Sequence, residues 1–84
     1  MEQRLVSPQQ LTSILTARRQ ARGLNQEAVA RPLKLSQNRY SELEHDPAKL
    51  TLDRLLSIAH TLGLELVIRD AGQQIANASL KSEW

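Results

Sequence analysis

Four short segments of this chain carry apolar residues at helical spacing, and a residue that can cap a helix comes just before each segment. The side-chain oxygens of Ser, Thr and Asn accept hydrogen bonds from the free N–H groups of a first helical turn. Helices this short are stable only when they pack against one another, so the sequence predicts an all-α bundle of four to five helices. The caps are Ser7, Asn25, Ser36 and Thr51, and the predicted helices span residues 8–22, 26–33, 37–44 and 52–62.

Apolar residues on these helices identify the candidate core. The fourth helix carries a continuous apolar stripe, whereas the second and third helices each contribute a few inward-facing side chains. The predicted core residues are Val29, Ala30, Leu33, Tyr40, Leu43, Leu52, Leu55, Leu56, Ala59 and Leu62.

Residues 64–69 follow a different pattern, in which apolar and polar side chains alternate as in a strand. A single strand in a helical domain leaves its backbone N–H and C=O groups without partners. The simplest partner is the same strand of a second copy across a two-fold axis, with Leu64, Leu66 and Ile68 in the dimer interface. The alternative is an extended arm that lies on the helices of its own chain.

The composition changes after residue 70. Residues 71–84 are rich in Gly, Gln, Asn, Ser and Ala, with Ile75 and Leu80 as isolated apolar residues. Such a composition predicts a flexible tail. The folded domain is therefore expected to span residues 1–70.

Several classes of protein are excluded by what the 84 residues lack. There is no cysteine for a disulfide or a thiolate zinc site, and no apolar run approaches the roughly 20 residues of a membrane span. His45 and His60 are scattered, without an acid–base constellation or a phosphate loop around them. We therefore expect a cytoplasmic protein that is not an enzyme and binds no metal, cofactor or small-molecule ligand.

Basic charge is concentrated in one part of the chain. Residues 17–39 hold six Arg and Lys residues against Glu27 alone, a net charge of +5, whereas residues 40–84 hold four basic and seven acidic residues, a net charge of −3. This asymmetry favours a polyanionic partner on one face. The alternative is a solvated helix face without a partner.

The segment 25–44 predicts how such a partner would bind. Two short helices joined by about three residues, the second one polar, suit the major groove of DNA, which is about 12 Å wide. The order Arg18-x-x-x-Arg22-Gly23-Leu24-Asn25-Gln26-Glu27-x-Val29-Ala30, followed by Leu35-Ser36-Gln37-x-x-Tyr40-Ser41-x-Leu43-Glu44, resembles the Xre/Cro/repressor family. The resemblance covers residues 11–66 and implies a helix-turn-helix regulator that binds double-stranded DNA. A helical interaction module that never binds DNA would not explain the polar, basic third helix.

Side chains at the start of the second and third helices are the candidate DNA contacts. Gln26 can bind a phosphate oxygen at a helix amino terminus, and the matching glutamine of the family braces the recognition helix. Gln37 carries both a donor and an acceptor and can bind adenine N6 and N7 together. Arg39 is a candidate for guanine or phosphate, or a solvated charge. The predicted DNA-binding residues are Gln26, Ser36, Gln37, Asn38, Arg39 and Ser41.

Other residues of the motif have structural interpretations. Ser41 resembles a phosphate-binding serine of the family, although it is equally interpretable as a plain surface residue. Glu44 is expected to bond within the fold, because a carboxylate repels phosphate. Pro32 removes a hydrogen bond to the Ala28 carbonyl, and Lys34 stands where the family often has glycine. These two departures leave the angle of the recognition helix open.

Within this family, the flanking residues resemble the HipB-type antitoxins, which pair with HipA-type kinase toxins. The resemblance implies a homodimer that represses its own operon and binds a HipA-like serine/threonine kinase toxin, with Trp84 contacting the toxin. The alternatives are a stand-alone Xre-family regulator and a terminal tryptophan without a role. The residues that carry the resemblance are Ser7-Pro8-x-Gln10-Leu11, Thr51-Leu52, the strand at 64–70 and Glu83-Trp84.

Overall fold

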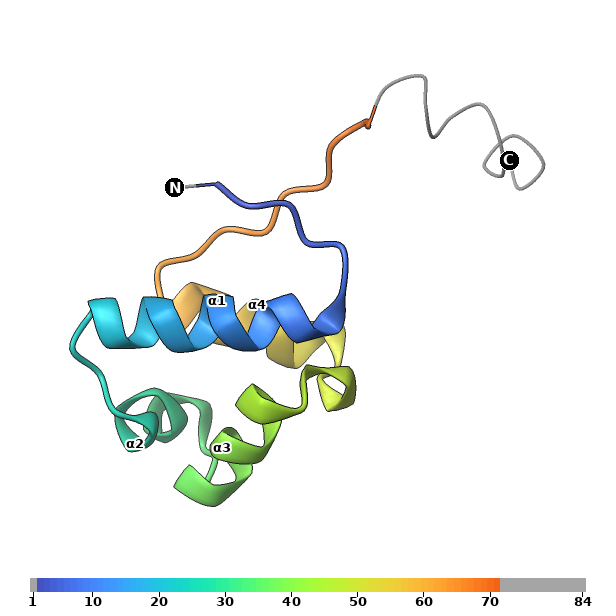
Figure 1. The fold of residues 1–84 in the computed structure, drawn as a ribbon. Coiled ribbons are helices and arrows are strands. Elements are labelled where there is room, and N and C mark those ends of the chain that lie inside the picture. The colour runs from blue at the N-terminus through green and yellow to red at the C-terminus, as the bar shows by residue number, and fades with distance from the viewer. Residues whose placement is uncertain (1, 72–84) are drawn as a thin grey trace.

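A computed structural model describes residues 2–71 of the chain. Within this range the secondary structure is helical and contains no strand, which confirms the predicted all-α bundle. In Figure 1, α2 and α3 lie on one side of α1, and the two terminal segments lie on the other side. The elements are α1 (Pro8–Ala21), α2 (Gln26–Ala30), the 3-10 helix η1 (Arg31–Leu33), α3 (Gln37–His45), the 3-10 helix η2 (Pro47–Lys49) and α4 (Leu52–Thr61).

All four predicted helix starts are confirmed by the hydrogen bonds at their caps. Three caps accept a bond from a backbone N–H three residues later: Asn25 at 2.8 Å, Ser36 at 3.0 Å and Thr51 at 3.1 Å. At the remaining cap, which precedes α1, the Ser7 N–H donates to Gln10 Oε1 at 3.0 Å. Three helices therefore begin where a cap side chain accepts a bond from the first turn, and α1 begins where the Gln10 side chain reaches back to the cap residue.

The second predicted helix, 26–33, is divided in the structure. The α-helix ends at Ala30, and the 3-10 turn η1 continues to Leu33. Pro32 has no N–H to donate to the Ala28 carbonyl, which explains the change of helix type. Lys34 ends the turn in the left-handed region with φ 60° and ψ 38°, a conformation that costs about 1–2 kcal/mol for a residue with a Cβ.

The core is confirmed in outline and corrected on α4. Tyr40 is completely buried, as predicted. Leu52 and Leu56 are wrong as core residues, because 68% and 47% of their surfaces are exposed, and Ile58 takes their place inside. The buried cluster consists of Leu15, Val29, Ala30, Tyr40, Ile58 and Leu62, with Leu11, Leu24, Leu33, Leu35, Leu50 and Leu64 packed against it.

The segment 64–71 runs as an extended chain after α4. Its first residue is anchored, since the Leu64 N–H donates to the Ala59 carbonyl at 2.8 Å and its side chain packs on the core. Leu66, Val67 and Ile68 are exposed, and Ile68 is fully so. The structure therefore does not support the alternative in which Leu66, Val67 and Ile68 pack on the helices of their own chain. Strand pairing with a second copy stays a prediction, because one chain is described.

Residues 2–71 contain neither a membrane-spanning helix nor a cluster of metal-ligating side chains. None of the helices there is long and apolar enough to cross a membrane. Within the same range, no group of three or more His, Cys, Asp or Glu side chains could hold a metal ion.

Candidate nucleic-acid interface

The amino-terminal half of α3 presents a polar face to solvent. Gln37, Asn38 and Arg39 are exposed, whereas Tyr40 and Leu43 are buried beneath them. Because the helix begins at Gln37, these three side chains occupy its first turn. That is the part of a recognition helix that meets base edges in the major groove.

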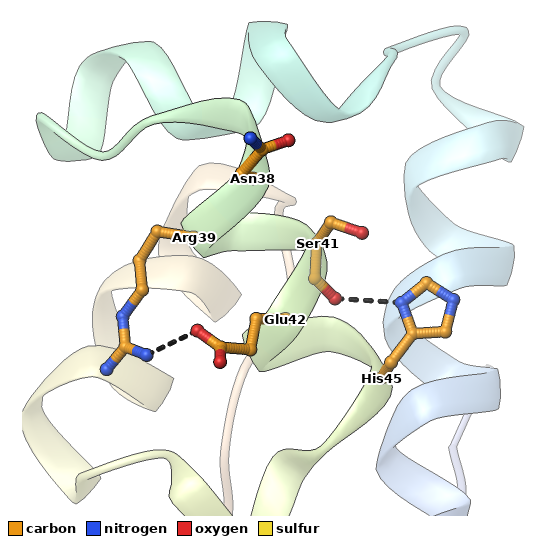
Figure 2. Close-up of a pocket in the computed structure, with 5 residues that line it drawn as sticks. All are labelled: Asn38, Arg39, Ser41, Glu42 and His45. Carbon is orange, nitrogen blue, oxygen red and sulfur yellow. Dashed lines mark hydrogen bonds and ion pairs between the residues drawn. The ribbon is translucent and has the colours of Figure 1, made fainter.

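Five side chains of α3, two of them from this first turn, line an open surface depression. They are Asn38, Arg39, Ser41, Glu42 and His45. Figure 2 shows Arg39 turned toward Glu42, with 2.6 Å between Nη1 and Oε1. A second dashed line in Figure 2 joins His45 Nδ1 to the Ser41 backbone carbonyl oxygen, and these two atoms lie 2.8 Å apart. Ser41 itself is half-buried.

Arg39 is therefore held by its own helix when no ligand is present. Its hydrogen bond, aided by the charge of Lys49, lowers the pKa of Glu42, so this carboxyl is ionised at neutral pH. A phosphate or guanine that binds Arg39 has to compete with this ion pair.

Below the exposed turn, a buried carboxylate connects three helices. Glu44 of α3 is only 1% exposed. It accepts two hydrogen bonds from Arg19 of α1, from Nε at 3.0 Å and from Nη2 at 3.2 Å. Gln26 of α2 donates a third bond through Nε2 at 3.3 Å. The prediction that Glu44 bonds within the fold is confirmed.

The ionisation of this buried group follows from its partners. Burial alone would raise the pKa of Glu44, but the bonds from Arg19, together with Tyr40, Gln26 and the guanidinium charge, outweigh burial and lower it. Burial and the adjacent carboxylate raise the pKa of Tyr40. The Tyr40 hydroxyl makes no hydrogen bond of ordinary geometry with the part of the chain that the structure describes.

The structure brings the six predicted DNA-binding residues together around the start of α2 and α3. Gln26 and Gln37 are linked directly, since Gln37 Nε2 donates to Gln26 Oε1 at 3.5 Å. Arg31 and Lys34 are exposed on the neighbouring turn, where Arg31 pairs with Glu27 at 3.4 Å. Leu64, Leu66 and Ile68 lie elsewhere, on the terminal segment, and Trp84 lies outside the described residues.

Sequence reasoning missed Arg19 as the partner of Glu44. A signal was present in the spacing. Arg19 follows the buried Leu15 by one helical turn, and Glu44 follows the buried Tyr40 by one turn. Opposite charges on two core-facing stripes are expected to pair, because neither tolerates burial alone.

The sequence of this chain matches a known family of DNA-binding domains. The family model described as helix-turn-helix matches residues 15–68. No curated protein matches the chain significantly.

Several solved structures are similar to this chain over most of its length. A HipB–O1–O2 complex is 29% identical, with a TM-score of 0.74, and the match covers 82% of this chain and 100% of that one. A HipB–O4 20mer complex is 30% identical, with a TM-score of 0.74, covering 83% and 99%. The chain matched in a HipA–HipB–O2–O3 complex is 28% identical, with a TM-score of 0.75, covering 83% and 99%.

Proposed function

Since this chain belongs to the helix-turn-helix family, we propose that it is a dimeric repressor that binds operator DNA and is the antitoxin of a HipA-like kinase. The observation that carries the DNA-binding part is the capped α3, whose exposed first turn presents Gln37, Asn38 and Arg39. Such a protein acts in the cytoplasm at the nucleoid, on the promoter of its own operon. The proposal assigns no enzymatic activity to the chain.

The roles of the individual residues follow from their chemistry. Gln37 is proposed to contact a base edge, and Asn38 and Arg39 to contact bases or phosphates beside it. Gln26 and Ser41 are proposed phosphate contacts, whereas Ser36 holds the first turn of α3 in place through the Arg39 N–H. A dimer would place two such helices in half-sites about 34–36 Å apart, or a multiple of that distance.

Operator binding is tested with a duplex from the promoter of the chain's own operon and a scrambled duplex of equal length. Gln37→Ala should cost about 1–3 kcal/mol on the promoter duplex and little on the scrambled one. Arg31→Ala or Lys34→Ala should instead weaken both duplexes alike, if these residues contact phosphate. Equal loss on both duplexes for Gln37→Ala would remove Gln37 from base recognition.

The antitoxin part is supported by the likeness to the HipB chain of a HipA–HipB–DNA complex. Trp84 is the chain's single tryptophan, and tryptophan is enriched among the residues that contribute most to protein interfaces. We therefore assign Trp84 to contact with the kinase, while the folded domain binds DNA.

Binding to a HipA-like kinase tests that assignment, and the proposal expects the gene of this kinase to lie beside the gene of this chain. Trp84→Ala should weaken the complex by about 2 kcal/mol, and deletion of residues 71–84 by at least as much. Operator affinity is the control and should not change in either variant. Unchanged kinase affinity in both would confine the contact to the folded domain. Absence of any complex with wild type would favour a stand-alone regulator.

A further inference from the structure

A continuous chain of polar contacts links the buried carboxylate of α3 to the exposed side chain proposed to contact a base. Arg19 donates two bonds to Glu44, Gln26 Nε2 donates to Glu44 Oε1 at 3.3 Å, and Gln37 Nε2 donates to Gln26 Oε1 at 3.5 Å. This series of contacts starts in the core at Glu44, whose side chain is 1% exposed, and ends at the exposed Gln37.

The buried carboxylate of Glu44 determines the direction of each hydrogen bond in this series. An ionised carboxylate only accepts hydrogen bonds, so Gln26 has to turn its NH₂ group toward Glu44. The Gln26 carbonyl oxygen then faces Gln37, and it too only accepts. Gln37 therefore has to turn its own NH₂ group toward α2, and its carbonyl oxygen is left free for a ligand.

This order matters at a base edge. One N–H of the Gln37 amide donates to Gln26. The other N–H and the Gln37 Oε1 lie side by side, so that one donor and one acceptor remain available for a base. Such a pair matches N7 and N6 of adenine. If the Gln26 amide were reversed, Gln37 would reverse as well, and the donor and acceptor would exchange places. The exchanged order would suit the base pair in its opposite orientation, because A·T and T·A are distinguishable in the major groove.

We propose that Glu44 is a positioning residue, which fixes the donor–acceptor order of Gln37 through Gln26 and thereby selects the orientation of one base pair in the operator. This inference rests on the proposed DNA-binding function. Glu44 is suited to the role because Arg19 holds both of its oxygens, so the carboxylate cannot rotate freely. Its lowered pKa keeps it an acceptor at neutral pH.

The experiment measures a ratio of affinities rather than an affinity. Promoter duplexes are made with all four base pairs at the position where Gln37→Ala loses its preference. For wild type, the preferred pair should bind about five- to 150-fold more tightly than the same pair reversed, the range expected for a bidentate contact. In Gln26→Met, which keeps the side-chain length without polar atoms, this ratio should fall to about threefold or less.

Glu44→Gln tests the buried end, because a glutamine there can present either an oxygen or an NH₂ group to Gln26. In Glu44→Gln, the ratio of affinities for the preferred and the reversed base pair should fall about threefold or more. When Glu44→Gln is added to Gln26→Met, this ratio should not fall any further. The matched control is Glu42→Gln, the same change on the exposed face of α3. Glu42→Gln frees Arg39 and is expected to change affinity for all four duplexes together, with the ratio unchanged.

The outcomes separate the two proposals. A wild type that binds promoter and scrambled duplexes equally would overturn the proposed function and this inference with it. A selective wild type whose ratio survives Gln26→Met would overturn the inference alone, even if Glu44→Gln fails to fold. Glu44→Gln could also lower the affinity ratio by the same factor in wild type and in Gln26→Met. That result would show that Glu44 does not act through Gln26, and it would overturn the inference as well.

Discussion

Arg19 is the residue on which the buried end of this polar network depends for stability. Its side chain is 12% exposed and pairs with a carboxylate that is 1% exposed. It also donates to the Leu24 carbonyl at 3.0 Å, which fixes the connection between α1 and α2. Removal of one partner of a buried ion pair leaves the other charge without compensation, a larger loss than the pair itself contributes.

We therefore expect Arg19→Met to lower the free energy of unfolding by about 3–5 kcal/mol. Urea denaturation followed by circular dichroism measures this change. Arg31→Met is the matched control, because Arg31 also pairs with a glutamate but is 76% exposed, and its loss should be below about 1 kcal/mol. Similar losses in the two variants would contradict the importance assigned to the buried pair.

Among the elements, the turn between α2 and α3 carries the clearest backbone strain. Lys34 has a positive φ of 60°, in the left-handed region that glycine adopts without penalty. Leu35 follows at once and donates its N–H to the Ala30 carbonyl at 3.0 Å, so the chain cannot relax without losing this bond. The strain is therefore maintained by the packing of the turn.

Lys34→Gly should stabilise the protein by about 1 kcal/mol, because the relieved strain exceeds the added entropy of the unfolded chain. Lys34→Ala is the control, since it removes the charge and keeps the Cβ, and it should give no gain. Thermal unfolding of the three proteins measures both effects. A gain in Lys34→Ala equal to that in Lys34→Gly would assign the effect to charge instead.

The boundaries of the elements were largely predictable from the sequence, because caps and glycines are local signals. Asn25, Ser36 and Thr51 each form the predicted bond to their own helix. The division of the second helix was not predicted in detail, since Pro32 indicates a lost bond without specifying the helix type that follows. The network through Gln26 and Glu44 was also not predictable in full, because it joins three helices whose relative placement is a tertiary property.

The error on α4 has a different cause. Apolar residues cover a wide arc of this helix, and periodicity does not distinguish burial within one chain from burial against another. Ile58 and Leu62 face the core, whereas Leu52 and Leu56 face outward. The candidate DNA contacts were predictable by residue type, and their roles stay predictions.

At the scale of the whole molecule, the described chain leaves apolar surface without cover. Exposed apolar side chains that gather in one area mark interaction surfaces, and Leu66, Val67 and Ile68 are exposed at consecutive positions. The terminal segments lie near each other, and Arg69 pairs with Glu2 at 3.7 Å. The exposed large apolar side chains are Leu5, Val6, Leu52, Leu56, Leu66, Val67 and Ile68.

Disruption of the predicted intersubunit strand should produce monomers. Leu66→Lys and Ile68→Glu each place a charge where the strand of a second copy is proposed to pack, and a buried unpaired charge is costly. Sedimentation velocity at micromolar concentration should show a dimeric wild type and monomeric variants, and the variants should lose tight operator binding. Glu65→Gln, in the same segment, is the control and should stay dimeric. A monomeric wild type would contradict the assembly.

The burial of Tyr40 also makes the core visible to absorption spectroscopy. It is the chain's single tyrosine, so any tyrosinate absorbance at 295 nm comes from this one hydroxyl. Because the folded state raises its pKa, the fold is favoured below the ordinary value of about 10 and loses this stabilisation as the pH rises above it. In an alkaline titration, the tyrosinate signal should therefore appear together with the loss of helical circular dichroism. A ligand that is itself stable in alkali and binds only the folded state should move both transitions to higher pH.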